Sequence, residues 1–425
     1  MWSLSVHVMA TFDARVTTKP GAGDWTSSLN WPQNHPEHDT DWYTQVEYSK
    51  KESGMQGKKL TRWIAALSLV ASLNVSSLSG SSAAQNAAAS TAIRMKRASA
   101  DSEPAADTGR NGKIAFLRNR GGAVDVYVVN PSGMTPVNLT RSRANELYVD
   151  WSPNGRHVVF TRFGKGAGNL FRISRSGKGL RRLTSGSPSD EMPRWSPDGS
   201  VIAFDRTVDD GQADVFVVDA RGTTVTRLTA TVLGDHVGGW SPDGTKIAIY
   251  RGVLDTEQFD IWVVNADGSG EVQLTYDPGD EFSPVFSPDA TRIAFMRRLE
   301  DQWDIFVMNA DGTDVTRLTD DPLDDAFPQW SPQGDRILFS RGRLEGTPRL
   351  DVVVMNADGS QERLLTDNPA DDFSPTWSPD GKWVTFVSDR SSNWELYVIG
   401  SEGERFNRIT RTRAFEFDPS WGSRP

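Results

Sequence analysis

Short runs of alternating hydrophobic and polar residues fill the chain from residue 111 to the C-terminus, and one pattern returns seven times. Each unit contains an aromatic residue, usually followed by Ser-Pro, and these anchors recur every 44 to 47 residues. They are Trp151, Trp195, Trp240, Phe286, Trp330, Trp377 and a truncated copy at Trp421. A period of this length built from several short β-type runs is typical of a propeller blade.

Each unit predicts four strands joined by turns. The first is short and often carries a Pro two residues before the aromatic; since Pro cannot donate to a ladder, one side of this strand should be unpaired. Ser-Pro-Asp-Gly, as at residues 241–244, then predicts a tight hairpin. The second and third strands have β-branched and aromatic cores such as 293–295 and 260–264. The fourth ends in Thr, usually after Leu, as at Leu318-Thr319.

The order of the units predicts how the ring closes. Strands of the second, third and fourth type first occur at Ile114, Asp125 and Asn138, before any anchor, and nothing follows the last anchor strand at Trp421. The simplest arrangement is an all-β, seven-bladed β-propeller of four-stranded antiparallel blades over 111–425. In it the C-terminal strand completes the N-terminal blade, three strands plus one, which removes free sheet edges. Six blades is the alternative. The anchor aromatics are expected to pack between blades.

The first quarter of the chain lacks the repeat. Residues 1–54 read as an unstructured leader, which would be untranslated if Met55 is the start. Residues 55–84 have the three parts of a signal peptide, namely basic residues, the apolar run 63–73 and small residues ending at 82–84. A membrane anchor and a buried helix are the alternatives. Residues 85–110 read as a flexible linker. We therefore expect export, to the periplasm or the extracellular space.

Composition argues against several classes of function. The chain of 425 residues has a formal charge of −10 and no cysteine. The acidic balance argues against nucleic acid as a partner, and the absence of cysteine excludes disulfides and thiolate chemistry. There is no Gly-x-Ser-x-Gly, His-Glu-x-x-His or phosphate loop, and only His157 and His236 lie in the repeats. We predict a monomeric binding protein that is neither an enzyme nor embedded in a membrane.

One acid recurs in every unit, five residues before the anchor aromatic. The seven are Glu146, Asp190, Asp235, Glu281, Asp325, Asp372 and Glu416. They precede the innermost strand, on the face whose loops vary in length, so they are expected to ring the mouth of the central channel. One interpretation is a structural clasp, in which each carboxylate accepts hydrogen bonds from the adjacent blade. The other is a binding ring for a basic partner or a cation, with a possible calcium site at Glu281, Asp325 and Asp372.

An arginine recurs two residues past the second-strand core in six units, and Arg390 lies near that position in the seventh. The six are Arg118, Arg162, Arg206, Arg251, Arg297 and Arg341. An acid on the third strand faces it in all units but one, which has Asn169. Cross-strand ion pairs between these two strands are the expected arrangement.

The four-part pattern Trp-Ser-Pro-Asp-Gly, Ile-Ala-Phe, Asp-Ile-x-Val-Asn-Ala-Asp-Gly and Leu-Thr resembles the repeats of the TolB-like propeller family over about 111–425. The resemblance implies an exported propeller that works by protein–protein contact, in some members with a cation near an acidic channel mouth. TolB itself has six blades after a separate α/β domain, whereas this chain has seven units after a linker. Oligogalacturonate lyases, which are also similar, need a His-rich centre that is missing here.

The predicted function is a protein-binding module or scaffold that uses its acidic, loop-variable face, with a basic segment as the partner. The alternative is a cell-envelope saccharide-binding protein or saccharide-acting enzyme that uses channel carboxylates and a divalent cation.

Overall fold

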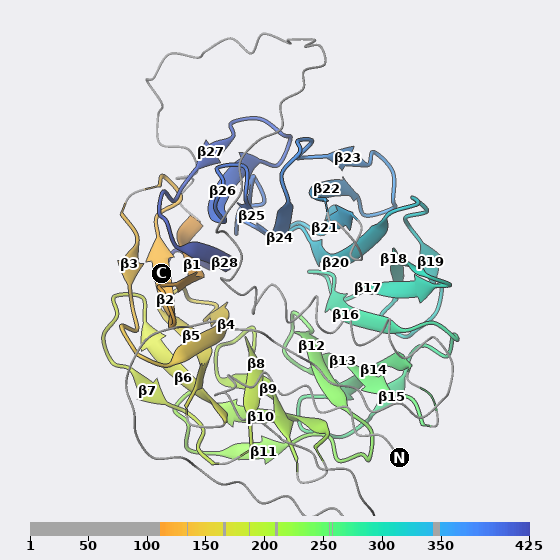
Figure 1. Ribbon diagram of the computed structural model, residues 1–425. Helices are drawn as coiled ribbons and strands as arrows, with labels where there is room; N and C mark the ends of the chain where they lie inside the picture. Colours follow the sequence, from red (N-terminus) through yellow and green to blue (C-terminus); the bar gives the residue numbers. More distant parts are fainter. Residues whose placement is uncertain are drawn as a thin grey trace, which may run out of the picture.

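The computed structural model describes residues 111–425, except 134, 165–166, 187, 209–210, 255, 257 and 343–348. The expected leader, signal peptide and linker lie outside the described residues. Seven four-stranded antiparallel sheets surround a central axis, so the seven-bladed propeller is confirmed and the six-bladed alternative is wrong (Figure 1). None of the described residues forms a helix that could span a bilayer.

The blades are numbered in chain order, and each runs from its innermost to its outermost strand. Blade 1 contains β28 (Phe415–Ser423), β1 (Asn111–Asn119), β2 (Val124–Val129) and β3 (Val137–Asn138). Blade 2 contains β4 (Asn145–Trp151), β5 (His157–Phe163), β6 (Gly168–Ser174) and β7 (Arg181–Arg182). Blade 3 contains β8 (Asp190–Trp195), β9 (Val201–Thr207), β10 (Ala213–Asp219) and β11 (Val225–Arg227).

The remaining four blades repeat this order. Blade 4 contains β12 (Asp235–Trp240), β13 (Lys246–Gly252), β14 (Phe259–Asn265) and β15 (Val272–Gln273). Blade 5 contains β16 (Glu281–Phe286), β17 (Arg292–Leu299), β18 (Gln302–Asn309) and β19 (Thr316–Arg317). Blade 6 contains β20 (Asp324–Trp330), β21 (Arg336–Gly342), β22 (Leu350–Asn356) and β23 (Arg363–Leu364). Blade 7 contains β24 (Asp372–Trp377), β25 (Trp383–Ser388), β26 (Glu395–Gly400) and β27 (Asn407–Arg408).

Closure follows the predicted three-plus-one scheme. The C-terminal strand β28 pairs antiparallel with β1, with Trp421 opposite Ile114 and Glu416 opposite Arg118. The end of the chain therefore supplies the innermost strand of the blade that its beginning builds, as Figure 1 shows where β28 lies beside β1. Both long edges of β1 are covered, which leaves no exposed inner edge for another chain to pair with.

The Ser-Pro-Asp-Gly segments form the predicted hairpins between first and second strands. In blade 4 the amide of Gly244 donates to the carbonyl of Ser241 at 2.8 Å, and the Ser241 hydroxyl donates to Asp243 Oδ1 at 2.6 Å. Gly244 has φ 73°, a conformation that a residue without a Cβ adopts readily. These hairpins lie on one face of the ring, which we call the hairpin face. The opposite face, with the loops between blades and between second and third strands, is called the loop face.

Six of the seven innermost strands contain a bulge with a non-glycine residue in the left-handed region. These residues are Tyr148, Met192, Ser283, Phe327, Ser374 and Asp418, with φ between 50° and 59°. The pairing of the first strand with the second is interrupted at the bulge, as between Phe282 and Val285. The proline lies in this interruption, where no backbone N–H is needed for a hydrogen bond to the neighbouring strand. This confirms the expected unpaired side of the first strand.

The anchor tryptophans pack between blades, as predicted. Trp151, Trp195, Trp330, Trp377 and Trp421 are all buried. The indole of Trp151 donates to the carbonyl of Ser420 at 3.0 Å, across the interface between blades 2 and 1. Similar bonds join Trp240 to Arg194, Trp330 to Val285 and Trp377 to Gln329. Each such ring contributes about 1.5–3 kcal/mol of hydrophobic transfer energy, and its N–H fixes how neighbouring blades dock.

Candidate functional site

The seven recurring carboxylates lie at or near the start of the innermost strands, on the loop face. All seven are fully enclosed, since six have no exposed surface and Asp190 has 1%. They therefore do not present their oxygens to the solvent at the channel mouth, as a binding ring would require.

Each of these carboxylates forms an ion pair with the recurring arginine of its own blade. The N–O distances are 2.5 Å for Arg118–Glu416, 2.8 Å for Arg162–Glu146, 2.6 Å for Arg206–Asp190, 2.5 Å for Arg251–Asp235, 2.6 Å for Arg297–Glu281, and 2.7 Å for both Arg341–Asp325 and Arg390–Asp372. The expectation that these arginines pair with third-strand acids was wrong. The two residues do face each other in register, as Arg206 and Asp214 do, but the ion pair forms with the first strand.

The third-strand acids take their partners from the fourth strand instead. Arg317 pairs with Asp304 at 2.8 Å, and Arg227 and Arg408 pair in the same way with Asp214 and Glu395. Every blade thus carries a row of polar side chains across its strands near the loop face. These ion pairs join neighbouring strands of one blade, so they stabilise the sheet.

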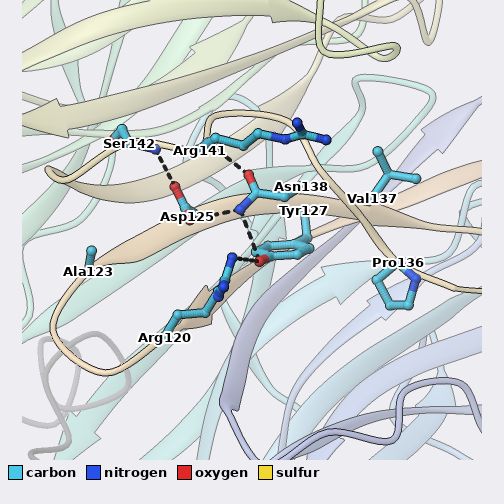
Figure 2. A pocket seen from close by; sticks show the side chains of 9 residues that line it. All are labelled: Arg120, Ala123, Asp125, Tyr127, Pro136, Val137, Asn138, Arg141 and Ser142. Carbon is cyan, nitrogen blue, oxygen red and sulfur yellow. Dashed lines mark hydrogen bonds between the residues drawn. The ribbon is translucent and has the colours of Figure 1, made fainter.

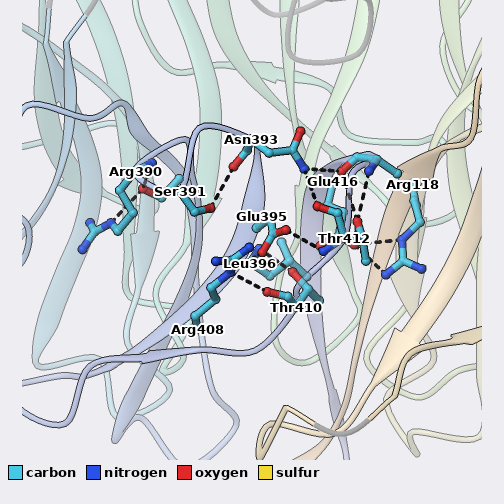
Figure 3. Close-up of polar contacts among 12 residues, drawn as sticks. Arg118, Arg390, Ser391, Asn393, Glu395, Leu396, Arg408, Thr410, Thr412 and Glu416 are labelled. Atoms are coloured by element: carbon cyan, nitrogen blue, oxygen red, sulfur yellow. Dashed lines mark hydrogen bonds and ion pairs between the residues drawn. The ribbon is translucent and has the colours of Figure 1, made fainter.

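The threonine that ends each fourth strand links this row to the next blade. Its hydroxyl oxygen accepts a third-strand amide in all seven blades, for example from Ile305 N to Thr319 at 3.0 Å. In blade 1 the Thr140 hydroxyl donates to Glu146 Oε2 of blade 2 at 2.9 Å. Figure 3 shows the junction where blade 7 meets blade 1, with Thr412, two residues after the fourth-strand Thr410, and Arg118 both bonded to Glu416. Of the two interpretations, this geometry matches the structural clasp.

The possible calcium site at Glu281, Asp325 and Asp372 does not fit this geometry. The three carboxylates lie in three different blades, each bonded to its own arginine. Over the described part of 111–425, no three His, Asp or Glu side chains are grouped so that they could hold a metal ion. Burial raises the pKa of Glu281 to about 7 and that of Asp325 to about 6, while the neighbouring Arg297 and Arg341 oppose this shift. A cation would have to displace an arginine to bind here.

A second polar group lies between blades 2, 3 and 4, where most blades have apolar contacts. The residue after the recurring acid is Leu147, Phe282, Ala326, Phe373 or Phe417 in five blades, but Glu191 in blade 3 and His236 in blade 4. His236 Nδ1 lies 2.8 Å from Asp205 Oδ2, and its ring stacks on Tyr250 with centroids 4.9 Å apart.

The charges around His236 favour its protonated form. Burial by itself lowers the pKa of His236, but the hydrogen bond and charge of Asp205, together with the charges of Asp235 and Glu191, raise it overall. Burial also raises the pKa of Glu191, to which Ser189 donates at 2.7 Å. His157, the other histidine of the repeats, lies in a different blade, so the structure does not bring the two together.

Exposed apolar and exposed charged side chains occupy different parts of the loop face. Three large apolar side chains stand out around blade 4, on three consecutive loops: Val232 is 75% exposed, Leu254 62% and Tyr276 75%. We call these three residues the apolar sector. The other strongly exposed hydrophobic residues of the described chain, such as Val225 and Val272, lie on or next to the outermost strands.

Exposed acids follow on the loops of blades 5 to 7 and define an acidic sector of Asp277, Asp301, Asp320, Asp321 and Asp367. The side chains of Asp320 and Asp367 are 84% and 79% exposed. Their arginine partners are shared, since Arg341 contacts Asp321, Asp325 and Glu362. Carboxylates therefore outnumber guanidinium groups here, and the sector carries negative charge.

Comparisons with known proteins agree with this fold. The TolB beta propeller domain model matches residues 240–350 and 328–424. A protein described as TolB from Agrobacterium tumefaciens is 25% identical, with 68% of this chain and 98% of that chain covered and a TM-score of 0.49. TolB from Acinetobacter baumannii is 16% identical, with coverage of 73% and 82% and a TM-score of 0.50.

Residues 240–424 of the propeller are TolB-like. An oligogalacturonate lyase in complex with manganese is also similar, at 17% identity, 71% and 86% coverage and a TM-score of 0.53. At that identity the likeness concerns the fold alone. No curated protein matches the chain.

In this TolB-like propeller the exposed acids differ from the recurring ones that the pattern singled out. Four of the exposed acids lie four or five residues before the recurring acid, at positions that carry no acid in the other four blades: Asp277, Asp320, Asp321 and Asp367. Variation between the repeats, rather than recurrence, was the signal that could have identified them. The long loop at 342–349 of this face lies largely outside the described residues.

Proposed function

We propose that this TolB-like propeller is an exported protein-binding module whose partner docks on the loop face, across the apolar and acidic sectors. The supporting observation is the set of three strongly exposed side chains, Val232, Leu254 and Tyr276, next to exposed acids. Large exposed apolar groups bordered by polar residues mark protein interaction sites. Loops on a rigid scaffold are also where recognition usually resides.

The negative charge of the acidic sector indicates what kind of partner would bind there. A surface with more carboxylates than guanidinium groups attracts a basic segment and speeds its association. The partner is therefore a protein that presents Lys or Arg next to apolar side chains. The recurring acids support this face indirectly, because they hold the loops that display the sectors. Export rests on the signal-peptide pattern at residues 55–84.

The test uses a random peptide library selected on the immobilised full-length protein. We expect selected peptides to combine Lys or Arg with apolar residues. Their affinity should fall about tenfold or more in Leu254→Ser/Tyr276→Ser and in Asp320→Asn/Asp367→Asn, since central interface side chains each contribute over about 1 kcal/mol.

The matched control is Val225→Ser/Val272→Ser, which removes two exposed apolar side chains from the outermost strands. Peptides that bind this variant and the wild type equally but lose affinity for the loop-face variants support the proposal. Peptides without basic residues, or peptides that bind all variants alike, contradict it.

The runner-up is the saccharide-binding protein or saccharide-acting enzyme. The observation in its favour is the His236–Asp205 pair, with His236 and Glu191 at positions that are apolar in the other five blades. Asp205 orients one ring nitrogen, which leaves the other able to exchange a proton with a ligand. Turnover of an oligosaccharide library that disappears in His236→Gln, but persists in His157→Gln, would favour this function.

A further inference from the structure

Two loops of the propeller share a sequence motif that other blades lack. Thr-Arg-Ser-Arg-Ala-Asn-Glu at residues 140–146 and Thr-Arg-Thr-Arg-Ala-Phe-Glu at 410–416 have the form Thr-Arg-x-Arg-Ala-x-Glu. The first leads from β3 into β4 and the second from β27 into β28, so they lie on the two sides of blade 1. Segments 270 residues apart thus present the same chemistry around one blade.

The two loops also share a set of hydrogen bonds. The hydroxyl between the arginines points inward, where Ser142 donates to Glu146 at 2.6 Å and Thr412 donates to Glu416 at 3.3 Å. The same hydroxyls accept the amides of Ala144 and Ala414, at 3.0 and 3.2 Å. Because the middle residue is held by the buried acid, the arginines on both sides of it are directed outward. Arg141, Arg143, Arg411 and Arg413 are all exposed.

Unlike Arg206, Arg317 and Arg341 near the same face, these arginines have no carboxylate partner among the described residues. Within the described residues, neither they nor the exposed Arg120 of the β1–β2 loop takes part in an ion pair. In contrast, the loops of blades 5 to 7 carry Asp320 or Asp367 where these loops carry Arg141 or Arg411. Five guanidinium groups therefore form a basic sector on a protein whose net charge is −10.

A pocket of about 690 Å³ opens between two of these arginines. Arg120 and Arg141 line it together with Tyr127, Asn138 and Ser142, and Figure 2 shows Arg120 reaching toward the Tyr127 hydroxyl, 3.4 Å away. Its volume is within the range of small-ligand sites.

The one carboxylate in the pocket is already bonded. Asp125 is 5% exposed and accepts bonds from Asn138 Nδ2 at 2.8 Å, Thr140 Oγ1 at 3.0 Å and Ser142 N at 2.8 Å. These donors occupy its oxygens, and the two arginines of the pocket outnumber its single negative charge.

We propose that this pocket binds a small multivalent oxyanion, a molecule with several phosphate or carboxylate groups. Planar guanidinium groups match the two oxygens of such groups, and charge-assisted bonds of this kind are the stronger ones. Arg120 and Arg141 contact the anion, while Arg143, Arg411 and Arg413 raise the local positive potential. The site is separate from the peptide surface proposed above and does not depend on it.

The test is calorimetric titration of the full-length protein at low ionic strength with tripolyphosphate and, separately, with citrate. We expect binding that weakens with added salt. Arg120→Ala/Arg141→Ala should reduce affinity by about tenfold or more, since bonds to charged groups contribute about 1.5–3 kcal/mol each. Arg411→Ala/Arg413→Ala should reduce it less. Saturation by tripolyphosphate alone assigns phosphate, and saturation by citrate alone assigns carboxylate.

The control is Lys178→Ala/Arg221→Ala, which removes the same charge from exposed hairpin-face positions. Its affinity should stay within about twofold of wild type. All substituted side chains are exposed, so unchanged thermal midpoints are expected and would confirm intact folding. The proposal is overturned if neither anion binds, if the control weakens binding as much as the pocket variant, or if Arg120→Ala/Arg141→Ala has no effect.

Discussion

At the scale of single residues, the recurring acid and the recurring arginine are two halves of one buried ion pair. Burying charges costs several kcal/mol, which the pair recovers only when both partners are present. Arg206 and Asp190 illustrate this, because they are joined at 2.6 and 2.9 Å and Asp190 is 1% exposed. Recurrence in every blade thus reflects a requirement of the fold.

Removing one half of this pair should be costly. Arg206→Ala leaves Asp190 buried without its cation, and we expect unfolding free energy to fall by about 3–5 kcal/mol. Urea denaturation measures this. The double variant Arg206→Met/Asp190→Leu should recover most of the loss, because it leaves no unpaired charge. A loss below about 0.5 kcal/mol, typical of exposed sites such as Arg221, would contradict the buried-pair assignment.

His236 gives a residue-scale prediction about pH. Asp205 and the nearby acids raise its folded pKa, so its charged form stabilises the fold below the unfolded value of about 6.5. That stabilisation is lost as pH rises through the folded pKa. NMR titration of the His236 ring should show a midpoint above about 6.5, and Asp205→Asn should lower it. An unchanged midpoint in Asp205→Asn would show that the pair does not control the protonation of His236.

At the scale of elements, hairpins of the hairpin face contain an aspartate whose pKa is lowered by hydrogen bonds within the turn. Hydrogen bonds from Ser241 and Thr245 lower the pKa of Asp243 to about 2, and Ser287 and Thr291 do the same for Asp289. These bonds form with the ionised carboxylate in the folded turn. The turn sequence is therefore also an acid-sensitive element.

Acid should weaken these hairpins over a defined range. A carboxylate with a folded pKa of about 2 and an unfolded pKa of about 4 contributes stability above pH 4, and this contribution is lost as pH falls toward 2. We expect the thermal midpoint to fall between pH 4 and 2. In Asp243→Asn/Asp289→Asn the midpoint should be lower at pH 7 and should fall less steeply in acid. Equal slopes for both proteins would count against the assignment.

Sequence predicts this fold well because each type of strand occurs seven times and each type of turn six or seven times. The Trp-Ser-Pro anchors, the Asp-Gly turns and the β28–β1 closure were all predictable from period and order alone. The ion pairs were not fully predictable, because Arg206 faces Asp190 on one neighbouring strand and Asp214 on the other. Only coordinates show which carboxylate turns toward the guanidinium group. The fixed spacing of 16 residues between acid and arginine in five blades was the available clue.

The candidate site was harder to predict for a related reason. Its exposed residues, such as Leu254 and Asp320, are those that differ from blade to blade, so no pattern draws attention to them. The recurring acids drew attention because they occur in every blade, but in the structure they are buried and hold the blades together.

At the scale of the whole molecule, the ring depends on β28. This strand covers the inner edge of β1, buries Trp421 and supplies Glu416 to Arg118. Without it, blade 1 would have three strands and an open inner edge next to the channel. Open edges of this kind pair with other chains.

Deleting residues 415–425 should therefore abolish the soluble monomer, and we expect aggregation or lost cooperative unfolding. Removing only Pro425, which follows the last strand, should have little effect. Size-exclusion chromatography and thermal unfolding of both proteins measure this. A stable monomer after the longer deletion would mean that blade 1 holds with three strands.

The same closure sets the order in which the protein can be completed. A ribosome makes β28 after all the other strands of the ring, and residues 139–414 lie between β3 and β28. Blade 1 therefore receives its inner strand only after the six other blades have been made. Domains that form as they emerge gain protection early, whereas this ring closes only in a final step. Its nascent chain is consequently most vulnerable to proteases and to misassembly until β28 has emerged.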